Sequence, residues 1–324
     1  MKCIYCGTDS KYSERSDGRC KCGKKFAFEP KTGDRFTDAG FKSAIDAVSA
    51  QGQIRWGVEH LYYELCRRLL NRGWWKIWSL LRGPRPRFVR LDQSTFDGLW
   101  QRWKTAHGLP TGLIVRKADP GVSKPREADI GDYSFDRAVL CDRARTVDLL
   151  IANNFHFENS CAVLSIGGYP KGPFETVRTM LKRNPKLQVF ALHDASVPGC
   201  TLAHTLANDP QWFKGQAQVN DLGLRPRHAG PFRGLLLPAQ GGPSVGPDQG
   251  ISADELQWLN AYLLELAAIR PEQILKRLFR GINRQEDSTS GSGDSGSSGS
   301  SVSSDGDSFS SDASDSDGGA DSFG

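Results

Sequence analysis

The sequence predicts an α/β protein that is built from four consecutive parts. Three observations support this prediction. Four of the eight cysteines lie within the first 22 residues, short apolar runs alternate with helical patterns over residues 135–280, and the end of the chain is rich in Ser, Gly and Asp. We therefore expect a cysteine module at residues 1–30, a helical domain at 37–115, a parallel-sheet domain at 135–280 and a disordered acidic tail at 284–324.

Two cysteine pairs define the N-terminal module. Cys3 and Cys6 are separated by two residues, Cys20 and Cys22 by one, and a glycine follows each pair. Four thiolates fill the coordination shell of one tetrahedral Zn²⁺, so the spacing predicts a structural zinc site with all four as ligands. The open alternative is four reduced, free cysteines. The pattern resembles the zinc-ribbon superfamily, whose members bind nucleic acid or protein.

The middle region is predicted to be helical because its apolar residues recur at helical spacing. The first helix presents an apolar face that begins at Phe41, and Asp38 is its expected N-cap. Two more helices are expected over residues 58–70 and around residues 96–103, with a short strand over residues 87–91 between them.

The region after residue 135 alternates strands with helices, which predicts a parallel sheet. The expected strands are residues 138–141, 161–166, 187–192 and 218–222. Functional side chains in such sheets gather beyond the carboxyl ends of the strands. Because Asp142, His193, Asp194 and Asp221 fall at these ends, we expect them to share one edge of the sheet.

The strand ends resemble the Toprim domain of topoisomerases, bacterial primases and related nucleases over residues 136–225. That family places an acid after the first strand, a glycine-rich turn after the second and an Asp-x-Asp pair after the third; Asp142 and Asp194 match the first acid of each motif. The resemblance implies that both are catalytic residues that hold Mg²⁺ or Mn²⁺ against a phosphodiester. Asp142 stands where the family has Glu, and Ser196 replaces the second acid, so metal binding should be weakened or lost. The alternative is that both aspartates cap helices at a Rossmann-like edge.

The segment from Val58 to Tyr63 resembles the winged-helix domain in the A subunit of type IIB topoisomerases. In that family a tyrosine of this helix attacks DNA, and a Toprim domain follows in the same chain. The order of parts is the same here, although Glu59 and His60 replace the arginine-rich approach to the tyrosine pair. Because two tyrosines on an apolar helix are expected in a core, Tyr62 and Tyr63 are not predicted to be nucleophiles.

The charges of the chain are divided unevenly. All 42 Lys and Arg residues lie before Glu286 together with 28 of the 37 acids, so this body has a net charge of +14, whereas the tail holds nine acids and no base. A body this basic favours a polyanionic partner such as DNA, and residues 67–90 add arginines interleaved with tryptophans. The alternative is a charge that serves solubility alone.

Two function classes follow from these patterns. The first is a DNA-associated zinc-ribbon protein whose Toprim-like domain is a weak metal-dependent phosphodiester enzyme or a degenerate binding domain. The second is a non-catalytic adaptor whose ribbon and tail recruit protein partners. No apolar run approaches the roughly 18 residues of a membrane span, and the chain begins without an apolar leader, so we expect no membrane contact and a cytoplasmic location.

Overall fold

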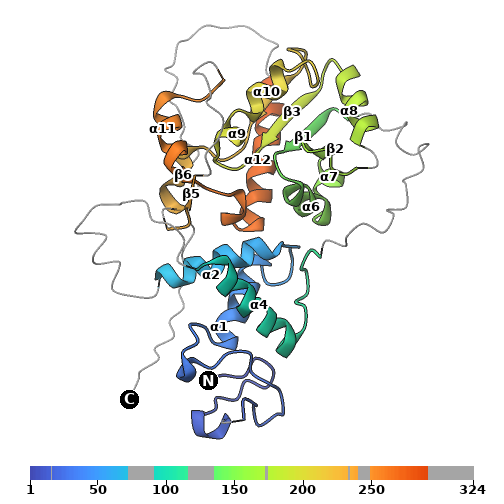
Figure 1. The fold of residues 1–324 in the computed structure, drawn as a ribbon. Coiled ribbons are helices and arrows are strands. Elements are labelled where there is room, and N and C mark those ends of the chain that lie inside the picture. Colours follow the sequence, from blue (N-terminus) through green and yellow to red (C-terminus); the bar gives the residue numbers. More distant parts are fainter. Residues whose placement is uncertain are drawn as a thin grey trace, which may run out of the picture.

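The computed structural model of the 324-residue chain describes residues 1–15, 17–71, 91–115, 135–171, 174–232, 234–239 and 249–290. Figure 1 shows three tiers, with the cysteine module at one end, the helical region in the middle and the sheet with its helices at the other end. This is the predicted α/β fold with an N-terminal four-cysteine cluster, a helical middle and a parallel sheet. The tail beyond residue 290, the arginine- and tryptophan-rich residues 72–90 and most of the strand expected at 87–91 lie outside the described residues.

The cysteine module has little regular structure of its own. It contains two short 3-10 helices, η1 (Tyr12–Arg15) and η2 (Pro30–Thr32), and two antiparallel bridges, Lys2 with Asp9 and Arg19 with Lys25. Its hydrophobic cluster consists of Cys3, Cys20 and Phe26, with Met1 packed against them. A cluster of this size buries too little apolar surface to hold a fold by itself.

Three helices form the middle tier: α1 (Asp38–Val48), α2 (Val58–Asn71) and α4 (Gln93–His107). The prediction that Asp38 caps α1 is wrong by one residue, because the hydroxyl of Thr37 accepts the Gly40 amide at 3.0 Å. Asp38 is fully buried, and its carboxylate accepts hydrogen bonds from the amides of Ala27 and Phe28. These bonds satisfy a buried charge and tie the end of the cysteine module to α1.

Four parallel strands form the sheet in the order β2-β1-β3-β4: β1 (Arg137–Cys141), β2 (Cys161–Ser165), β3 (Gln188–Leu192) and β4 (Gln218–Asp221). The register pairs Cys141 with Ser165 on one side and with Leu192 on the other. The carboxyl ends of the two central strands are therefore level, which places the residues that follow them side by side.

Helices cover both faces of the sheet, with α8 (Phe174–Arg183) and α10 (Leu202–Asn208) on one face and α6 (Ala144–Ala152) and α7 (Phe155–Glu158) on the other. Along β1, Ala138 and Leu140 pack with the first pair of helices, whereas Val139 and Cys141 pack with the second. Because both faces are covered, β1, β2 and β3 are mostly apolar and buried, whereas the edge strand β4 is polar and only partly buried.

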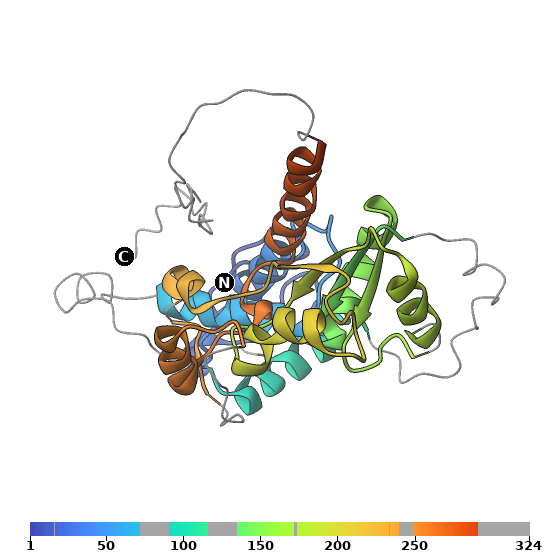
Figure 2. The same cartoon turned by 90° about the horizontal axis from the view of Figure 1, so that it is seen from above.

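The remaining elements extend the second face: α9 (Val197–Cys200), η3 (Pro226–Phe232), β5 (Leu237–Pro238), α11 (Ala253–Ala261), β6 (Tyr262–Leu263), η4 (Leu266–Ala268) and α12 (Pro271–Ser290). Figure 2 shows α12 projecting from the body of the molecule. One hydrophobic cluster runs from Phe28 through the helical tier to Ile282 in α12. The helical and sheet regions thus share a core, and the division into domains at 37–115 and 135–280 stays a prediction.

Candidate metal centre and sheet-edge site

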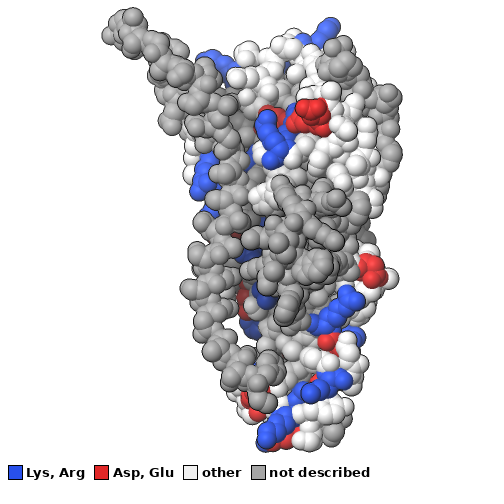
Figure 3. Space-filling view, turned by 90° about the vertical axis from the view of Figure 1, so that its left-hand side faces the viewer, with Lys and Arg blue, Asp and Glu red and all other residues white. Residues whose placement is uncertain are grey.

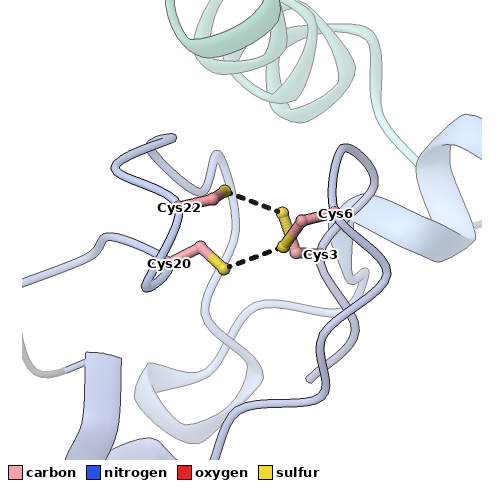
Figure 4. A group of neighbouring side chains, drawn as sticks. All are labelled: Cys3, Cys6, Cys20 and Cys22. Atoms are coloured by element: carbon pink, nitrogen blue, oxygen red, sulfur yellow. Dashed lines mark hydrogen bonds between the residues drawn. The ribbon is translucent and has the colours of Figure 1, made fainter.

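The four N-terminal cysteines converge on one point. Their sulfur atoms all lie within 4.8 Å of one another. Cys3 Sγ is 3.8 Å from Cys22 Sγ, and Cys6 Sγ is 3.5 Å from Cys20 Sγ (Figure 4). A tetrahedron with Zn–S bonds of about 2.3 Å has edges of about 3.8 Å. The four cysteines are therefore placed to hold one metal ion.

Each cysteine pair lies on a tight turn. In the first turn the Gly7 amide donates to the Cys3 carbonyl at 3.0 Å, and in the second the Gly23 amide donates to the Cys20 carbonyl at 2.8 Å. Both glycines have a positive φ, +71° and +84°, which a side chain would disfavour. The first hydrogen bond spans four residues and the second spans three, so the shorter spacing of the second pair corresponds to a tighter turn.

Thiols packed this closely cannot all lose their protons unless a cation lies between them. Hydrogen bonding to Thr8 lowers the pKa of the Cys6 thiol to about 6. At Cys22 a hydrogen bond from the Lys24 backbone is outweighed by desolvation and by the neighbouring thiols, which raise the pKa to about 11. A divalent metal ion removes this conflict, because it binds the thiolate form of all four.

Polar contacts fix the cysteine module on the helical tier. His107, at the end of α4, has its Nε2 2.6 Å from Asp38 Oδ2, and its Nδ1 lies 3.2 Å from the hydroxyl of Tyr5. Arg102 of the same helix donates to the Ala27 carbonyl at 2.7 Å. Tyr5 stands between two of the cysteines in sequence, so the metal centre is connected directly to α4. No sequence pattern indicated His107 or Tyr5, because their partners lie 69 and 102 residues away.

Asp142 and Asp194 lie side by side at the carboxyl edge of the sheet. The Asp194 amide donates to Asp142 Oδ2 at 2.9 Å. Neither residue caps a helix: the N-cap of α6 is Arg143, and that of α9 is Ser196, whose hydroxyl accepts the Gly199 amide at 3.1 Å. The helix-capping alternative is therefore wrong, and the expected second acid is replaced by a residue that begins a helix.

Both carboxylate oxygens of Asp194 are already bound by the protein. Oδ2 accepts Arg143 Nε at 2.5 Å, Oδ1 accepts the Leu266 amide at 2.6 Å, and the side chain is 3% exposed. Arg143 thus supplies positive charge where a metal ion would supply it. In contrast, Oδ1 of Asp142 is buried and has no hydrogen-bond partner among the described residues, so it can take a proton, a water or a cation.

His193 and Asp221 form a second polar pair at this edge. His193 Nε2 lies 2.9 Å from Asp221 Oδ1, and Nδ1 lies 2.8 Å from the carbonyl oxygen of Asp194. Because both neighbours are acceptors, the ring carries both protons. Burial lowers the pKa of His193, but the hydrogen bond and charge of Asp221 outweigh it and raise the pKa above its usual value. Both ring nitrogens of His193 are therefore engaged, and neither is free to bind a metal ion.

Within the described ranges, the four cysteines are the only group of three or more His, Cys, Asp or Glu residues whose ligand atoms converge. The sheet edge offers two neighbouring carboxylates, one of them engaged by Arg143. The Mg²⁺ or Mn²⁺ site at Asp142 and Asp194, and their catalytic role, therefore stay predictions.

Tyr62 and Tyr63 belong to the core, as expected, with exposures of 8% and 1%. Tyr62 donates to the Leu91 carbonyl at 2.8 Å, and Tyr63 donates to Glu265 Oε2 at 3.0 Å. Burial raises the pKa of both hydroxyls, which opposes formation of a phenolate nucleophile.

Asp142→Asn is expected to become more stable than the wild type as pH rises. Burial and the charge of Asp194 raise the pKa of Asp142 from 3.8 to about 7. The stability that protonated Asp142 contributes is therefore fully present below pH 3.8 and is lost as pH rises through about 7. Since Asp142 as a whole is only half-buried, we expect a gap of about 2 kcal/mol in the free energy of unfolding at about pH 8.

Urea unfolding of both proteins between about pH 5 and pH 8, without added Mg²⁺ or Mn²⁺, measures this gap. The comparison cancels the opposite contribution of His60, whose pKa is lowered by burial. If the difference in the free energy of unfolding does not grow over this pH range, the pKa of Asp142 is not raised in the folded protein.

Comparisons of the chain with protein-family models, with curated proteins and with solved structures gave no match. The zinc-ribbon, winged-helix and Toprim names therefore remain resemblances of short residue patterns. The structure itself shows a four-cysteine cluster and a parallel four-stranded sheet. In the part of the chain that it describes, no helix combines the length and the apolar character that crossing a membrane requires.

Proposed function

We propose that this protein binds nucleic acid, DNA above all, through a zinc-bound cysteine module. The supporting observation is the charge of the second cysteine turn. Four exposed cations flank its two cysteines: Arg19, Lys21, Lys24 and Lys25. Figure 3 shows Lys and Arg side chains, interspersed with Asp and Glu, at the lower end of the molecule, where Figure 1 places the module.

Most of this charge is uncompensated. Lys21 pairs with Glu14 at 3.0 Å. Arg19, Lys24 and Lys25 have no carboxylate partner within the described residues. A Zn²⁺ ion with four thiolates carries a net charge of −2, which the three unpaired cations exceed. Exposed cations on a fixed turn bind phosphates and release the counterions of the nucleic acid.

The metal has a structural role in this proposal. Four sulfurs at tetrahedral spacing leave no open coordination position, so the ion performs no chemistry on a bound partner. The ion holds the two cysteine turns together, because the module has a hydrophobic cluster of only three buried residues. The positions of the second turn and of its cations therefore depend on the metal.

Deletion of residues 286–324 is expected to raise the affinity for DNA at low salt. It removes nine acids and no base from a chain whose remainder has a net charge of +14. A tethered acidic segment competes for the basic surface at the effective concentration that its linker sets. Fluorescence anisotropy with labelled DNA measures both proteins, and the difference should fade at high salt as both interactions are screened.

Equal affinities at low salt would show that the tail does not compete for the basic surface. If neither protein bound DNA or RNA at any salt concentration, the nucleic-acid function would be excluded. The remaining candidate would then be the non-catalytic adaptor that recruits protein partners.

A second candidate is a weak metal-dependent phosphodiester enzyme that uses the sheet edge. The observation that favours it is the buried, unpartnered Oδ1 of Asp142 beside Asp194. The bonds of Asp194 to Arg143 and to the Leu266 amide weigh against it, because a metal ion would have to displace at least one of them.

This candidate predicts weak, roughly millimolar Mn²⁺ binding, as for sites with few charged ligands. Ser196→Asp should tighten the binding, since aspartate restores the second acid and still caps α9. Asp194→Asn should abolish it. Isothermal calorimetry on the wild type and the two variants decides the matter, because three identical isotherms would exclude a metal site at this edge.

A further inference from the structure

A groove of about 520 Å³ lies where the cysteine module meets α4. One wall is the chain that follows the second cysteine turn, including Lys25 and Phe26, and the opposite wall is α4 at Gln101 and Thr105. Tyr12 also lines the groove, and its side chain is 46% exposed. The volume is in the range of sites that enclose small organic groups.

Tyr12 lies beside a buried residue that the fold holds in place. Tyr12 is the first residue of η1, and Arg15 is the last. The guanidinium carbon of Arg15 lies 5.8 Å from the Tyr12 ring centroid. Arg15 is 6% exposed and is held by Glu29 at 2.7 Å and by the Ser10 carbonyl. An exposed aromatic ring whose backbone and neighbour are already fixed loses little entropy when a flat partner stacks on it.

The groove has a positive charge that its own side chains do not cancel. Arg15 is paired with Glu29, and Arg102 is paired with Asp34 at 2.6 Å, so both are neutralised within the fold. Lys25 is exposed and has no carboxylate partner within the described residues. Its bridge to Arg19 joins the groove directly to the cations of the second turn.

A second hollow, larger than the groove, has the opposite character. A cavity of about 800 Å³ beside α2 is lined by three carboxylates, Glu59, Asp92 and Glu265, and by one cation, Arg145, which is paired with Glu265 at 2.7 Å. This lining repels phosphate. A polyanion is thus directed to the groove at the module and away from the cavity beside α2.

We infer that the groove binds a single-stranded segment of nucleic acid, with a base stacked on Tyr12 and the adjoining phosphates on Lys25 and the second turn. The inference rests on the proposed function and adds the site and the strandedness of the partner. Bases in a duplex are stacked on each other, so only an unpaired base can present its face to a protein ring. Stacking tolerates any base, and the groove should therefore show little sequence preference.

The test uses the full-length, zinc-loaded protein and a fluorescently labelled oligodeoxythymidine, with an unlabelled duplex as competitor. Tyr12→Ala is expected to weaken binding roughly 5- to 150-fold, because it removes one stacked base. Tyr12→Phe keeps the ring and should bind like the wild type. Lys25→Ala should weaken binding and make the salt dependence shallower by about 0.7 in the slope of log K against log salt.

Two matched controls lie far from the groove. Phe157→Ala removes a 71% exposed ring from α7, and Lys186→Ala removes an exposed cation before β3; neither should change binding. Zinc content and helical circular dichroism confirm that each variant is folded.

Failure of this inference can be told from failure of the proposed function. If the wild type binds the oligonucleotide and Arg19→Ala weakens binding, but Tyr12→Ala does not, the groove is wrong and the basic turn remains. Preference of the wild type for the duplex also overturns the inference. Absence of all nucleic-acid binding overturns both.

Discussion

A Cys20→Ser variant is expected to contain no tightly bound zinc, whereas the wild type should contain one ion per chain. Cys20 is 4% exposed, and its sulfur lies 3.5 Å from that of Cys6, so the change removes one corner of the tetrahedron. Structural zinc contributes roughly 10–16 kcal/mol to the folding of short modules. Residues 1–30 should therefore unfold locally, while the helical tier and the sheet stay folded. Native mass spectrometry gives the metal content, and hydrogen exchange locates the unfolding.

The matched control is Cys161→Ser in β2, where the cysteine is also buried, at 1% exposure, but far from the cluster. It should lose some stability and keep its zinc. Full zinc occupancy in Cys20→Ser, or loss of zinc in Cys161→Ser, would contradict the ligand assignment.

Glu64→Gln is expected to destabilise the whole protein by roughly 3 kcal/mol. Glu64 is 2% exposed and binds Arg67 and Arg68 of its own helix as well as Arg270 before α12 at 3.1 Å. Burial alone would raise the pKa of Glu64, but the charge of Arg67 and the hydrogen bond from Arg270 lower it. Removing the carboxylate leaves several partly buried guanidinium groups without their counter-charge.

The control is Glu175→Gln on α8, whose partner Arg178 lies at 2.5 Å but whose side chain is 68% exposed. An exposed pair of this kind contributes at most about 0.5 kcal/mol. Urea unfolding at neutral pH measures both variants. Similar losses in the two would show that the buried ion pairs of Glu64 contribute no more than an exposed pair.

The sequence was most informative about structure that depends on residues only a few positions apart. The spacing of Cys3, Cys6, Cys20 and Cys22 required turns that bring the sulfurs together, and they lie within 4.8 Å of one another. The four predicted strands also occur in the structure, each within two residues of its expected ends. Three of these strands are short, mostly apolar runs, and their alternation with helices favours a buried parallel sheet.

The sequence was least informative about contacts between distant residues. Aspartate is a common helix cap, but the carboxylate of Asp38 is buried and accepts hydrogen bonds from two amides of the preceding segment. Thr37 caps the helix instead. Arg143 pairs with Asp194 across 51 residues, and the Leu266 amide donates a hydrogen bond to it from 72 residues away. No local pattern specifies such pairs, because they exist only once the strands are aligned.

Zinc-dependent binding of nucleic acid is tested most directly by the affinity of the full-length protein for labelled oligonucleotide before and after a chelator removes the zinc. The affinity is measured across a range of salt concentrations. The zinc-loaded protein should bind with a steep salt dependence, lose most of its affinity when zinc is removed, and recover it when zinc is restored. Binding that is unchanged by zinc removal while the cysteine module is shown to unfold, or no binding by the zinc-loaded protein at low salt, would contradict zinc-dependent binding.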